Sequence, residues 1–505
     1  MKQEKLKSIS LDAAFLSAPN ETTEDRKQGA FDVNTAPSLQ NFGKVWPVPG
    51  DDFLIVPVGG LGRIGMNWTL YGHKGRWLLV DAGIAFAGRD KEDVDCLIPE
   101  PEALSSILPK LDGLVVTHAH EDHIGAIAKV WPHRINCPIY ATPYATRVIE
   151  HRFEEAGTID DVVMYQFTPG DTLTIGEFVI ETVRMTHSVP EPVALAFKTP
   201  DGVIFHSGDW KLDEDPLIGE TTDFDALMRI GKEGVLALLC DSTNAHKSLA
   251  LTNEREVLDA FIPAFKNTKG TVVVCCFASN IARVSAAAQA AEASGRHYAL
   301  AGRSMRTNVE IALDLGMLDH VMPPLAEVRH LKGLDRREKA LICTGTQGEE
   351  RAALARLARG DIGLPLLGRG DAVIISARSI PGNEKEIDAI VEQLRYRGVS
   401  VLRGGDLVDD KPVHVSGHAG RNELEALYNL LEPRIAIPVH GHAMHQEAHA
   451  ELAEEMGAEQ IVIAEESNVI SVSRDGASII GRVEVPIIEL MVDEPAYAPP
   501  MMAMG

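Results

Sequence analysis

The sequence has few cysteines, an excess of acidic over basic residues and no long apolar run. Only six of its 505 residues are cysteines, none in a CxxC pair, and we expect reduced, buried apolar side chains rather than a thiolate metal site. No run approaches the roughly 18 apolar residues of a membrane-spanning helix, and the N-terminus lacks an apolar segment followed by a small-residue cleavage site. We therefore expect a cytoplasmic protein without a membrane segment.

The charge balance limits the kinds of partner. The chain carries 48 basic and 73 acidic side chains, a formal net charge of −25. Because Lys and Arg supply most of the affinity for phosphate backbones, this balance argues against a broadly basic surface that coats nucleic acid. It leaves room for a local basic channel, or for a metal site that supplies the positive charge.

The pattern of apolar residues predicts an α/β protein of two to four domains. From Phe53 onward, short aliphatic and β-branched runs bounded by Gly, Pro, Asp and His are typical of strands. From about Thr252 the pattern becomes a regular alternation of helix and strand. That alternation predicts a parallel sheet with crossover helices in a separate domain.

The strongest chemical signal is the segment THAHEDHIG, which contains His118, His120, Asp122 and His123 after an apolar strand. Residues two apart in an extended chain face the same side, so His118 and His120 can reach one metal ion. Asp122 and His123 lie past the turn and can reach another. Divalent cations of borderline softness accept imidazole and carboxylate together, and two such ions can hold a hydroxide between them. The segment therefore predicts a dimetal site.

Three further candidate ligands stand at the ends of predicted strands: His187, Asp209 and His440. A single histidine at a strand end is more often structural than a ligand. The incomplete coordination offered by THAHEDH makes a ligand role more credible for each of them. A carboxylate such as Asp209 can bridge two cations, which one imidazole cannot.

The segment GGLGRIG resembles a dinucleotide-binding motif, with Gly60, Gly62 and Gly65 in the GxGxxG spacing and Asp81 where a ribose-binding acid could lie. That motif requires a helix that opens at the third glycine. Two strand-like runs around an HKG turn follow instead. We therefore interpret the glycines as tight backbone near the metal site.

Several segments have the form of a phosphate-binding turn. HVSGHAG, with His414, Ser416 and His418, combines small residues that expose backbone N–H groups with imidazoles that can donate a proton. CFASN, GRSM, TGTQGE and ISARSIPGNE have a related strand-to-turn form. Each alone is more simply interpreted as an ordinary capped turn. Their number beside a predicted dimetal site favours a polyanionic substrate.

Together these motifs resemble a known family. THAHEDH with His187, Asp209 and His440 is similar to the signature of the metallo-β-lactamase fold. DSTNA, SGHA and PVHG resemble motifs of its β-CASP branch, the nucleases that process nucleic acids. Within that branch, GGLGRIGMN, IARV, TGTQGE, IPGNE and HVSGHA resemble bacterial ribonuclease J. The resemblance extends from about Phe53 to about Val472.

The resemblance implies a metallo-β-lactamase αββα sandwich with an inserted β-CASP α/β domain. The implied organisation is a flexible N-terminal extension over residues 1–50, a metallo-β-lactamase domain over 51–248 and 376–480, a β-CASP domain over 249–375 and a C-terminal tail over 481–505. It further implies a metal-dependent ribonuclease of RNA processing and decay. Such an enzyme would be a 5′-to-3′ exonuclease on 5′-monophosphorylated single-stranded RNA with endonuclease activity, cleaving by hydroxide attack on the phosphodiester.

The cofactors and partners follow from the same resemblance. We expect two divalent metal ions, with zinc favoured and manganese or magnesium compatible, because the ligands are imidazoles and carboxylates without thiolates. We expect single-stranded RNA as substrate, a homo-oligomer (dimer or tetramer) and protein partners in an RNA-degradation complex.

Residue roles are carried over from the family onto matching positions. His118, His120 and His187 would hold one metal ion, Asp122, His123 and His440 the other, and Asp209 would bridge them. Asp122 is also counted as catalytic, and His418, oriented by Asp241, would be the general acid for the leaving 3′-oxygen. The candidate substrate contacts are His414, Ser416, Gly417, His418, Ser279, Asn280, Arg303, Ser376 and Arg378.

The sequence departs from the family at several positions. Arg63 stands where an acidic residue is common, His442 replaces a common glutamate after PVHG, and Arg378 and Ser379 interrupt the usual ISASPIPGNE. The chain also ends soon after IIGRVEV, where relatives usually continue into a small further domain. None of these departures removes a predicted ligand.

Two other functions remain open. A small-molecule metallo-hydrolase such as a thioesterase would not need the long insertion between Asp241 and His418. A weakly active or non-catalytic RNA-binding subunit of a degradation complex would not need the complete ligand set. Whether DNA is also cut is open, because the metal chemistry attacks either backbone.

Overall fold

The computed structural model describes residues 39–86, 93–249, 252–319, 322–361, 363–380 and 382–491. The chain divides into a short unit, Met1–Gln40, and a main unit, Asn41–Gly505, and the candidate site residues all belong to the main unit. Residues 1–38 of the expected N-terminal extension and residues 492–505 of the expected tail lie outside the described residues.

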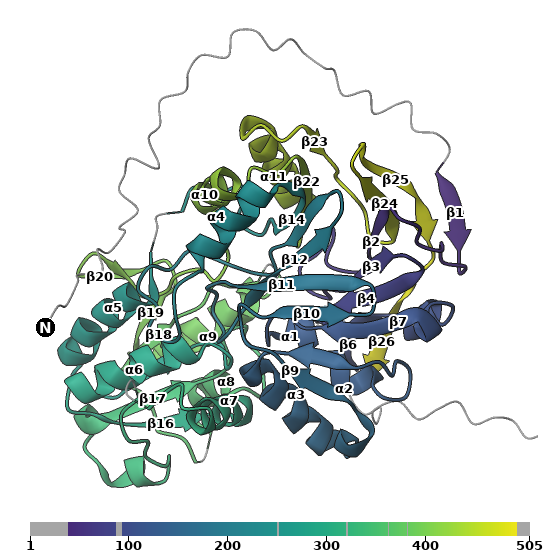
Figure 1. Ribbon diagram of the computed structural model, residues 1–505. Helices are drawn as coiled ribbons and strands as arrows, with labels where there is room; N and C mark the ends of the chain where they lie inside the picture. Colours follow the sequence, from purple (N-terminus) through teal and green to yellow (C-terminus); the bar gives the residue numbers. More distant parts are fainter. Residues whose placement is uncertain are drawn as a thin grey trace, which may run out of the picture. The chain divides into compact units, whose positions relative to one another are not determined.

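Two large sheets of mixed strand direction carry the candidate ligands (Figure 1). In the first sheet the strands lie in the order β25 (Gly476–Val483), β24 (Asn468–Ser473), β2 (Phe53–Pro57), β3 (Thr69–His73), β4 (Arg76–Val80), β7 (Leu111–Val115), β8 (Ile139–Ala141) and β9 (Met164–Gln166). In the second they lie in the order β10 (Thr172–Ile175), β11 (Phe178–Arg184), β12 (Val193–Thr199), β13 (Gly202–His206), β14 (Val235–Asp241), β22 (Ile435–Val439) and β23 (Gln460–Ile461). The remaining strands outside the inserted sheet are β1 (Gln40–Gly43), β5 (Ala85–Phe86), β6 (Val94–Pro99), β20 (Leu407–Val408), β21 (Lys411–Pro412) and β26 (Ile487–Met491).

The two sheets pack face to face through an aromatic and aliphatic core. The ring centroids of Tyr71 on β3 and Phe197 on β12 lie 4.4 Å apart, and Phe53 on β2 lies 5.6 Å from Phe197. Strand β2 is buried along its whole length. Its alternate side chains face opposite sides of the sheet, and both sides are covered. Ile55 lies in the core between the sheets, and Leu54 lies in the apolar cluster on the other face. The continuous apolar runs of the sequence are thus strands covered on both faces.

Helices cover the outer faces of both sheets, which completes an αββα sandwich (Figure 1). Helix α3 (Pro143–Ala156) buries Tyr144 and Ile149 in the cluster of the first sheet, and α4 (Phe224–Glu233) buries Leu227 beside the second. The other helices of this layer structure are α1 (Glu121–Ile124), α2 (Ile127–Val130), α10 (Arg421–Leu431) and α11 (Ala443–Glu455), with 3₁₀ turns at Pro101–Leu104, Leu108–Lys110 and Ile159–Asp161.

A third sheet is inserted in the chain between β14 and β22. Its strands lie in the order β16 (His297–Ala301), β17 (Lys339–Cys343), β15 (Val272–Cys275), β18 (Ala372–Ile375) and β19 (Ser400–Arg403), and every neighbouring pair is parallel. Its helices are α5 (Glu254–Asn267), α6 (Ile281–Ala293), α7 (Arg303–Asp314), α8 (Ala353–Arg359) and α9 (Glu384–Tyr396), with 3₁₀ turns at His330–Gly333 and Arg336–Glu338. The predicted parallel sheet with crossover helices is confirmed.

The predicted domain limits stay a prediction. Strand β19 belongs to the inserted sheet and follows residue 375, the predicted end of the inserted domain. Strand β26 lies within residues 481–505, the segment expected to be a tail. It pairs with β6.

All six cysteines are buried and unpaired, as expected from the apolar runs that contain them. In the described part of the chain, no helix has both the length and the apolar character that crossing a bilayer requires.

A buried charge network joins the inserted helices to the HVSGH segment. Arg283 of α6, fully buried, donates to both carboxylate oxygens of Glu254 on α5 at 2.9 Å. Although burial alone would raise it, Arg283 and Lys211 hold the pKa of Glu254 at about 2. The same guanidinium donates to the Ser376 hydroxyl at 2.6 Å and to His414 Nδ1 at 2.9 Å. Arg283 thereby links α5 and α6 to the residues that precede the predicted general acid.

Replacement of Arg283 by methionine is expected to lower the free energy of unfolding by about 3–5 kcal/mol, because the buried Glu254 carboxylate would lose both hydrogen bonds and keep only Lys211, at 3.8 Å. Denaturant unfolding followed by circular dichroism measures the loss. The matched control is Arg255→Met on the same helix pair, whose ion pair with Asp215 is solvent-exposed and is worth less than about 1 kcal/mol. Equal stability of the two variants would contradict the role assigned to Arg283.

Candidate metal centre and active site

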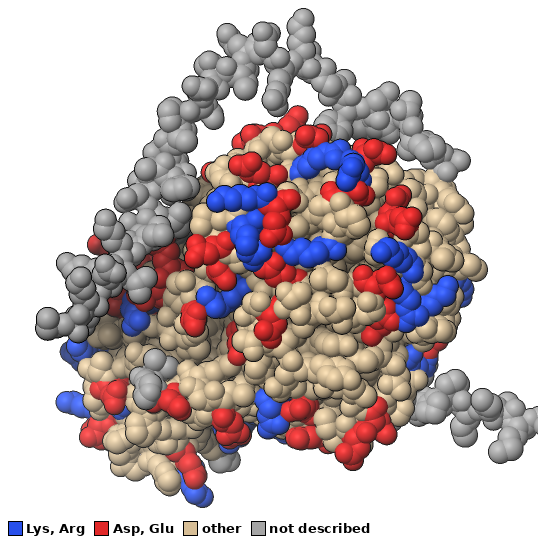
Figure 2. Space-filling model, viewed as in Figure 1, with Lys and Arg blue, Asp and Glu red and all other residues tan. Residues whose placement is uncertain are grey.

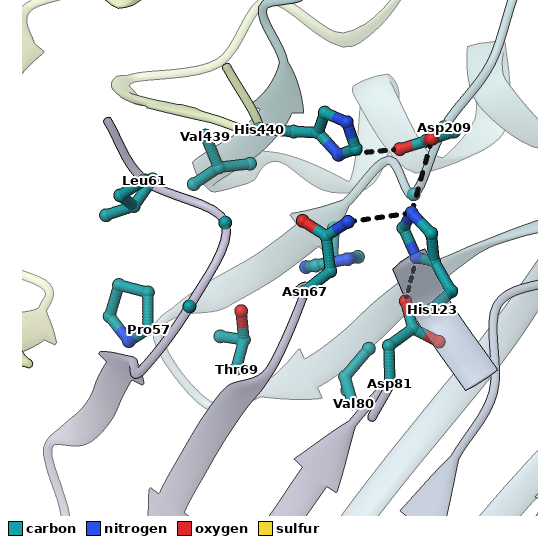
Figure 3. Close-up of a pocket in the computed structure, with 14 residues that line it drawn as sticks. Pro57, Leu61, Asn67, Thr69, Val80, Asp81, His123, Asp209, Val439 and His440 are labelled. Carbon is teal, nitrogen blue, oxygen red and sulfur yellow. Dashed lines mark hydrogen bonds and ion pairs between the residues drawn. The ribbon is translucent and has the colours of Figure 1, made fainter. Parts of the chain in front are cut away.

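The candidate ligands lie at the C-terminal ends of strands from both sheets. His118 and His120 follow β7, His187 follows β11, Asp209 follows β13 and His440 follows β22. Strands β13, β14 and β22 are parallel neighbours, so the residues that follow them meet at one edge of the second sheet. Figure 3 shows that side chains from both sheets meet there.

Three imidazoles form the first group of ligand atoms with Asp209. Nδ1 of His120 lies 3.2 Å from Nε2 of His118 and 3.0 Å from Nε2 of His187. Nδ1 of His118 lies 3.0 Å from Thr117 Oγ1, and Nδ1 of His187 lies 2.5 Å from the carbonyl oxygen of Gly417. With Nδ1–H of these two rings used in this way, Nε2 of His118 and Nε2 of His187 carry lone pairs that face His120. Such an arrangement fits a cation, and fixing the tautomer from behind is typical of metal-binding histidines.

The second group consists of Asp122, His123, Asp209 and His440. Nε2 of His123 lies 3.2 Å from Asp209 Oδ2 and 3.6 Å from Asp122 Oδ2. Nδ1 of His440 lies 3.2 Å from Asp209 Oδ1, and its Nε2 lies 3.8 Å from Asp122 Oδ2. Among the described residues, neither nitrogen of His440 nor Oδ2 of Asp209 makes a hydrogen bond, although all three atoms are buried.

Buried polar atoms without a hydrogen bond are costly unless something else satisfies them. The two groups share Asp209, and their donors are nitrogen and oxygen atoms that divalent cations accept. The residues present therefore fit divalent metal ions.

The electrostatics of the cluster agree with this fit. Burial lowers the pKa of His120 to about 4 and the pKa values of His118 and His187 well below the usual value, so these imidazoles are neutral. Burial alone would raise the pKa of Asp209, but His440 and His123 hold it well below its usual range. In the first group an ionised carboxylate thus lies among neutral imidazoles, the protonation state in which metal ligands act. In the second group burial alone would lower the pKa of His123, but Asp209 and Asp122 raise it well above its usual value, so this ring would lose a proton when it binds a cation.

His418 and Asp241 form a pair beside the shared carboxylate, and with Asp209 and His440 they make a third group of atoms that could hold a metal ion. Nδ1 of His418 lies 2.8 Å from Asp241 Oδ2 and 3.8 Å from Asp209 Oδ2. The other carboxylate oxygen of Asp241 accepts hydrogen bonds from the backbone N–H and the hydroxyl of Thr243, at 2.9 and 2.7 Å. Burial alone would lower the pKa of His418, but Asp241 and Asp209 raise it to about 9.

The segment around His418 is held by its neighbours. Ser416 Oγ accepts hydrogen bonds from the Asn244 amide at 2.9 Å and from the His418 backbone N–H at 3.1 Å. The Asn244 amide also donates to the His418 carbonyl oxygen at 3.1 Å, and Gly417 accepts from His187. The turn is therefore tied both to a candidate ligand and to the loop that follows Asp241.

Other residues predicted to contact substrate already form hydrogen bonds within the protein. The Ser376 hydroxyl donates to the Val413 carbonyl at 2.6 Å and accepts from Arg283, which also faces the half-buried His414 ring. Asn280 is buried and caps helix α6, because its side-chain oxygen accepts from the Arg283 backbone N–H at 2.9 Å. The structure therefore places these side chains in the protein framework, and their contact with substrate stays a prediction.

Three further predicted contacts are open to solvent to different degrees. Arg303 is exposed at the first turn of α7, and Arg378 is exposed after β18. Ser279 is half-buried in the turn before α6. None of the three belongs to the groups of metal-ligating atoms found among the described residues.

Sequence reasoning named Asp81 only as a possible ribose-binding acid and missed its contact with the candidate ligand His123. Asp81 has a φ of 60°, and its carboxylate contacts Nδ1 of His123 at 2.7 Å and accepts from the backbone N–H and the hydroxyl of Thr117 at 2.8 Å. Asp81 follows β4, the parallel neighbour of β7, so its position at that strand end was the available signal. Asn67 was also missed, and its amide donates to the backbone oxygen of Asp122 at 3.1 Å.

The glycine-rich segment GGLGRIG is a loop whose backbone pairs with the residue next to His440. It leads into β3 and not into a helix, and the φ of Gly60 is 83°. A Cβ on Gly60 would lie 2.4 Å from the Asn67 side-chain oxygen. Backbone bridges join both Leu61 and Arg63 to Gly441, next to His440. This agrees with the interpretation of the glycines as tight backbone.

The same loop accounts for one departure from the family pattern. Nε of Arg63 lies 2.8 Å from Oε1 of Glu466, so the basic residue at this position has an acidic partner.

Comparison with known protein families matches three parts of the chain. A beta-lactamase superfamily domain matches residues 76–232, a ribonuclease J beta-CASP domain matches residues 269–394, and a Zn-dependent metallo-hydrolase RNA specificity domain matches residues 411–464. A crystal structure of a protein of unknown function from Enterococcus faecalis has a TM-score of 0.55 at 13% identity and covers 83% of this chain and all of its own, which supports the fold alone.

The fold and the site thus define a metal-dependent hydrolase of the metallo-β-lactamase fold with an inserted β-CASP domain. Ribonuclease J of Sinorhizobium meliloti is 38% identical over 435 residues, which cover 85% of this chain and 76% of that protein. Ribonuclease J 1 of Streptococcus pyogenes is 36% identical over 429 residues, covering 85% and 76%. The chain belongs to the ribonuclease J family, so the predicted family, fold class and metal-dependent ribonuclease activity are confirmed.

Asp81→Asn is expected to weaken metal binding about 10-fold to 100-fold, because the charge that orients His123 through Nδ1 is removed. Asparagine tolerates the positive φ of this position, so the backbone should not change. Titration of the metal-loaded protein with a chelator measures the affinity. Asp215→Asn, at an exposed position, is the control, and an affinity of Asp81→Asn equal to it would contradict the orienting role.

Proposed function

We propose that this ribonuclease is a cytoplasmic 5′-to-3′ exonuclease on single-stranded RNA with a 5′-monophosphate, with additional endonuclease activity. The supporting observation is that three groups of ligand atoms share Asp209, and the third of them contains the pair His418 and Asp241. Membership of the ribonuclease J family supports the substrate class. Assembly as a dimer or tetramer and partners in a degradation complex stay predictions.

The proposed ligand sets follow the first two of these groups. His118, His120 and His187 would hold one ion, Asp122, His123 and His440 the other, and Asp209 would contact both. We propose zinc, because a histidine-rich set of nitrogen and oxygen donors suits it, and manganese or magnesium as alternatives. When bound, the cations supply Lewis acidity that activates water and offsets charge on the phosphate oxygens.

The residues of the chain then perform the proton transfer at the leaving group. Because Nδ1 of His418 is engaged by Asp241, Nε2 is the ring nitrogen available to substrate. Nε2–H would donate its proton to the 3′-oxygen as the phosphorus–oxygen bond breaks. Asp241, held by Thr243, stabilises the protonated ring and fixes its orientation. Ser416 and the Gly417 backbone would position the phosphate.

His418→Ala is expected to reduce kcat about 10²-fold to 10⁴-fold while leaving the metal content close to that of the wild type. The reason is that the proposed role concerns proton donation and not metal binding. Steady-state RNA cleavage and elemental analysis of the same preparation measure both quantities. Loss of metal in this variant would identify His418 as a ligand and overturn the general-acid assignment.

Cleavage of a uniformly labelled RNA carrying a 5′-monophosphate is expected to release mononucleotides, and a 5′-triphosphorylated copy is expected to be a poorer substrate. The double variant Asp122→Ala/His123→Ala is the control and should release none. Internal fragments in the same reaction would report endonuclease activity. Wild-type protein with a full metal load that cleaves neither RNA would refute the proposal and favour the RNA-binding or small-molecule alternatives.

A further inference from the structure

A cluster of basic side chains lies beside the candidate active site and belongs to neither ligand group. We name it the basic rim cluster, and its members are His246, Lys247, Arg378, His442 and His445. They come from the loop after β14, the loop after β18 of the inserted sheet, and the segment at the start of α11.

The histidines of the basic rim cluster are in ring contact. The rings of His246 and His445 are stacked with centroids 4.8 Å apart and an interplanar angle of 4°, and those of His442 and His445 lie 5.5 Å apart. The His442 backbone N–H donates to Nδ1 of His445 at 3.3 Å. In its neutral form His445 therefore carries its proton on Nε2, which makes that atom a hydrogen-bond donor.

Lys247 and Arg378 add permanent positive charge to the basic rim cluster. Burial and the charge of Arg378 lower the pKa of Lys247. Burial followed by the charges of Lys247 and Arg378 lowers the pKa of His246. These shifts show that the basic groups repel one another. Both Lys247 and Arg378 are exposed at the surface.

Within the described part of the chain, no member of the basic rim cluster takes part in an ion pair, and no acidic group shifts the pKa of Lys247 or Arg378. On the face shown in Figure 2 basic side chains lie among acidic ones, and Arg229 pairs with both Glu181 and Glu233. Neighbouring basic side chains without an ion-pair partner make a local positive potential that favours an anion.

The position of the basic rim cluster indicates which anion. Asn244, two residues before His246, holds Ser416 and the His418 backbone. Nδ1 of His442 lies 3.3 Å from the Gly62 carbonyl, in the loop that borders His440. A strand bound at the candidate active site would therefore continue next to these side chains.

We propose that the basic rim cluster binds the phosphodiester backbone of the RNA strand beside the scissile bond. This inference rests on the proposed function, since it assigns a further contact to the same substrate. Lys247 and Arg378 supply the charge, and the imidazoles of His246 and His445 supply N–H donors to the phosphate oxygens. Two of the departures from the family pattern, Arg378 and His442, fall in this cluster.

The test compares Lys247→Ala/Arg378→Ala with a matched control, Lys332→Ala/Arg337→Ala. The control removes the same charge from exposed positions that precede β17, at the opposite end of the inserted sheet from Arg378. The probe is a fluorescent 12-nucleotide 2′-O-methyl RNA, bound to the metal-loaded protein and followed by anisotropy at several salt concentrations. Gel electrophoresis verifies that the probe stays intact.

The cluster variant is expected to raise Kd about tenfold at low salt. Because each phosphate contact contributes about 0.7 to the slope of log K against log salt for single strands, the slope should fall by about 1.4. The control should match the wild type in both quantities. A Kd and a slope of the cluster variant that equal those of the control would overturn the proposal.

A second variant, His442→Glu, places a carboxylate in the basic rim cluster. Because this negative charge repels phosphate, Kd is expected to rise as well. An unchanged Kd would count against the proposal. Metal content is expected to stay at the wild-type level in both variants, and its loss would assign these residues to the support of the ligands instead. Binding is measured without cleavage, so failure of the wild type to cleave RNA would refute the proposed function separately.

Discussion

The buried carboxylate of Asp209 is the constraint on which the rest of the site depends. Its Oδ2 and both ring nitrogens of the neighbouring His440 are buried and make no hydrogen bond within the described chain. Burial of an ion and several lone pairs without compensation is strongly unfavourable. Divalent cations held by the two groups of ligand atoms would offset that cost.

The two sheets and the outer hydrogen bonds make this arrangement possible. Thr117 and Asp81 continue or follow strands of the first sheet, and they fix the rings of His118 and His123 from behind. Asp209 and His440 follow strands of the second sheet. The aromatic core between the sheets holds these two sets at a fixed separation, so the ligand atoms meet without a flexible segment in between.

Much of the fold could be predicted from sequence, because its strands are continuous apolar runs covered on both faces and its inserted domain alternates helix and strand regularly. The candidate ligands could be named because imidazoles and carboxylates gathered in one short segment are far more typical of a metal site than of a solvated surface. The substrate contacts were harder to name. Ser376, Asn280 and His414 stand in turns of suggestive form, yet they bind Arg283, a residue distant in sequence from two of them that no local pattern connects to the set.

The sequence by itself determined the chemistry available: the donor types in THAHEDH, the histidines and carboxylate at later strand ends, and the family to which their order belongs. Only the tertiary structure decided which atoms face which. Asp81 acquires its role because β4 and β7 are parallel neighbours, and Gly60 acquires its role because the Asn67 side chain leaves no room for a Cβ. The basic rim cluster likewise exists only after folding, since its members come from three segments that lie far apart in the chain. Contacts between distant segments depend on strand order and packing, which local residue patterns do not encode.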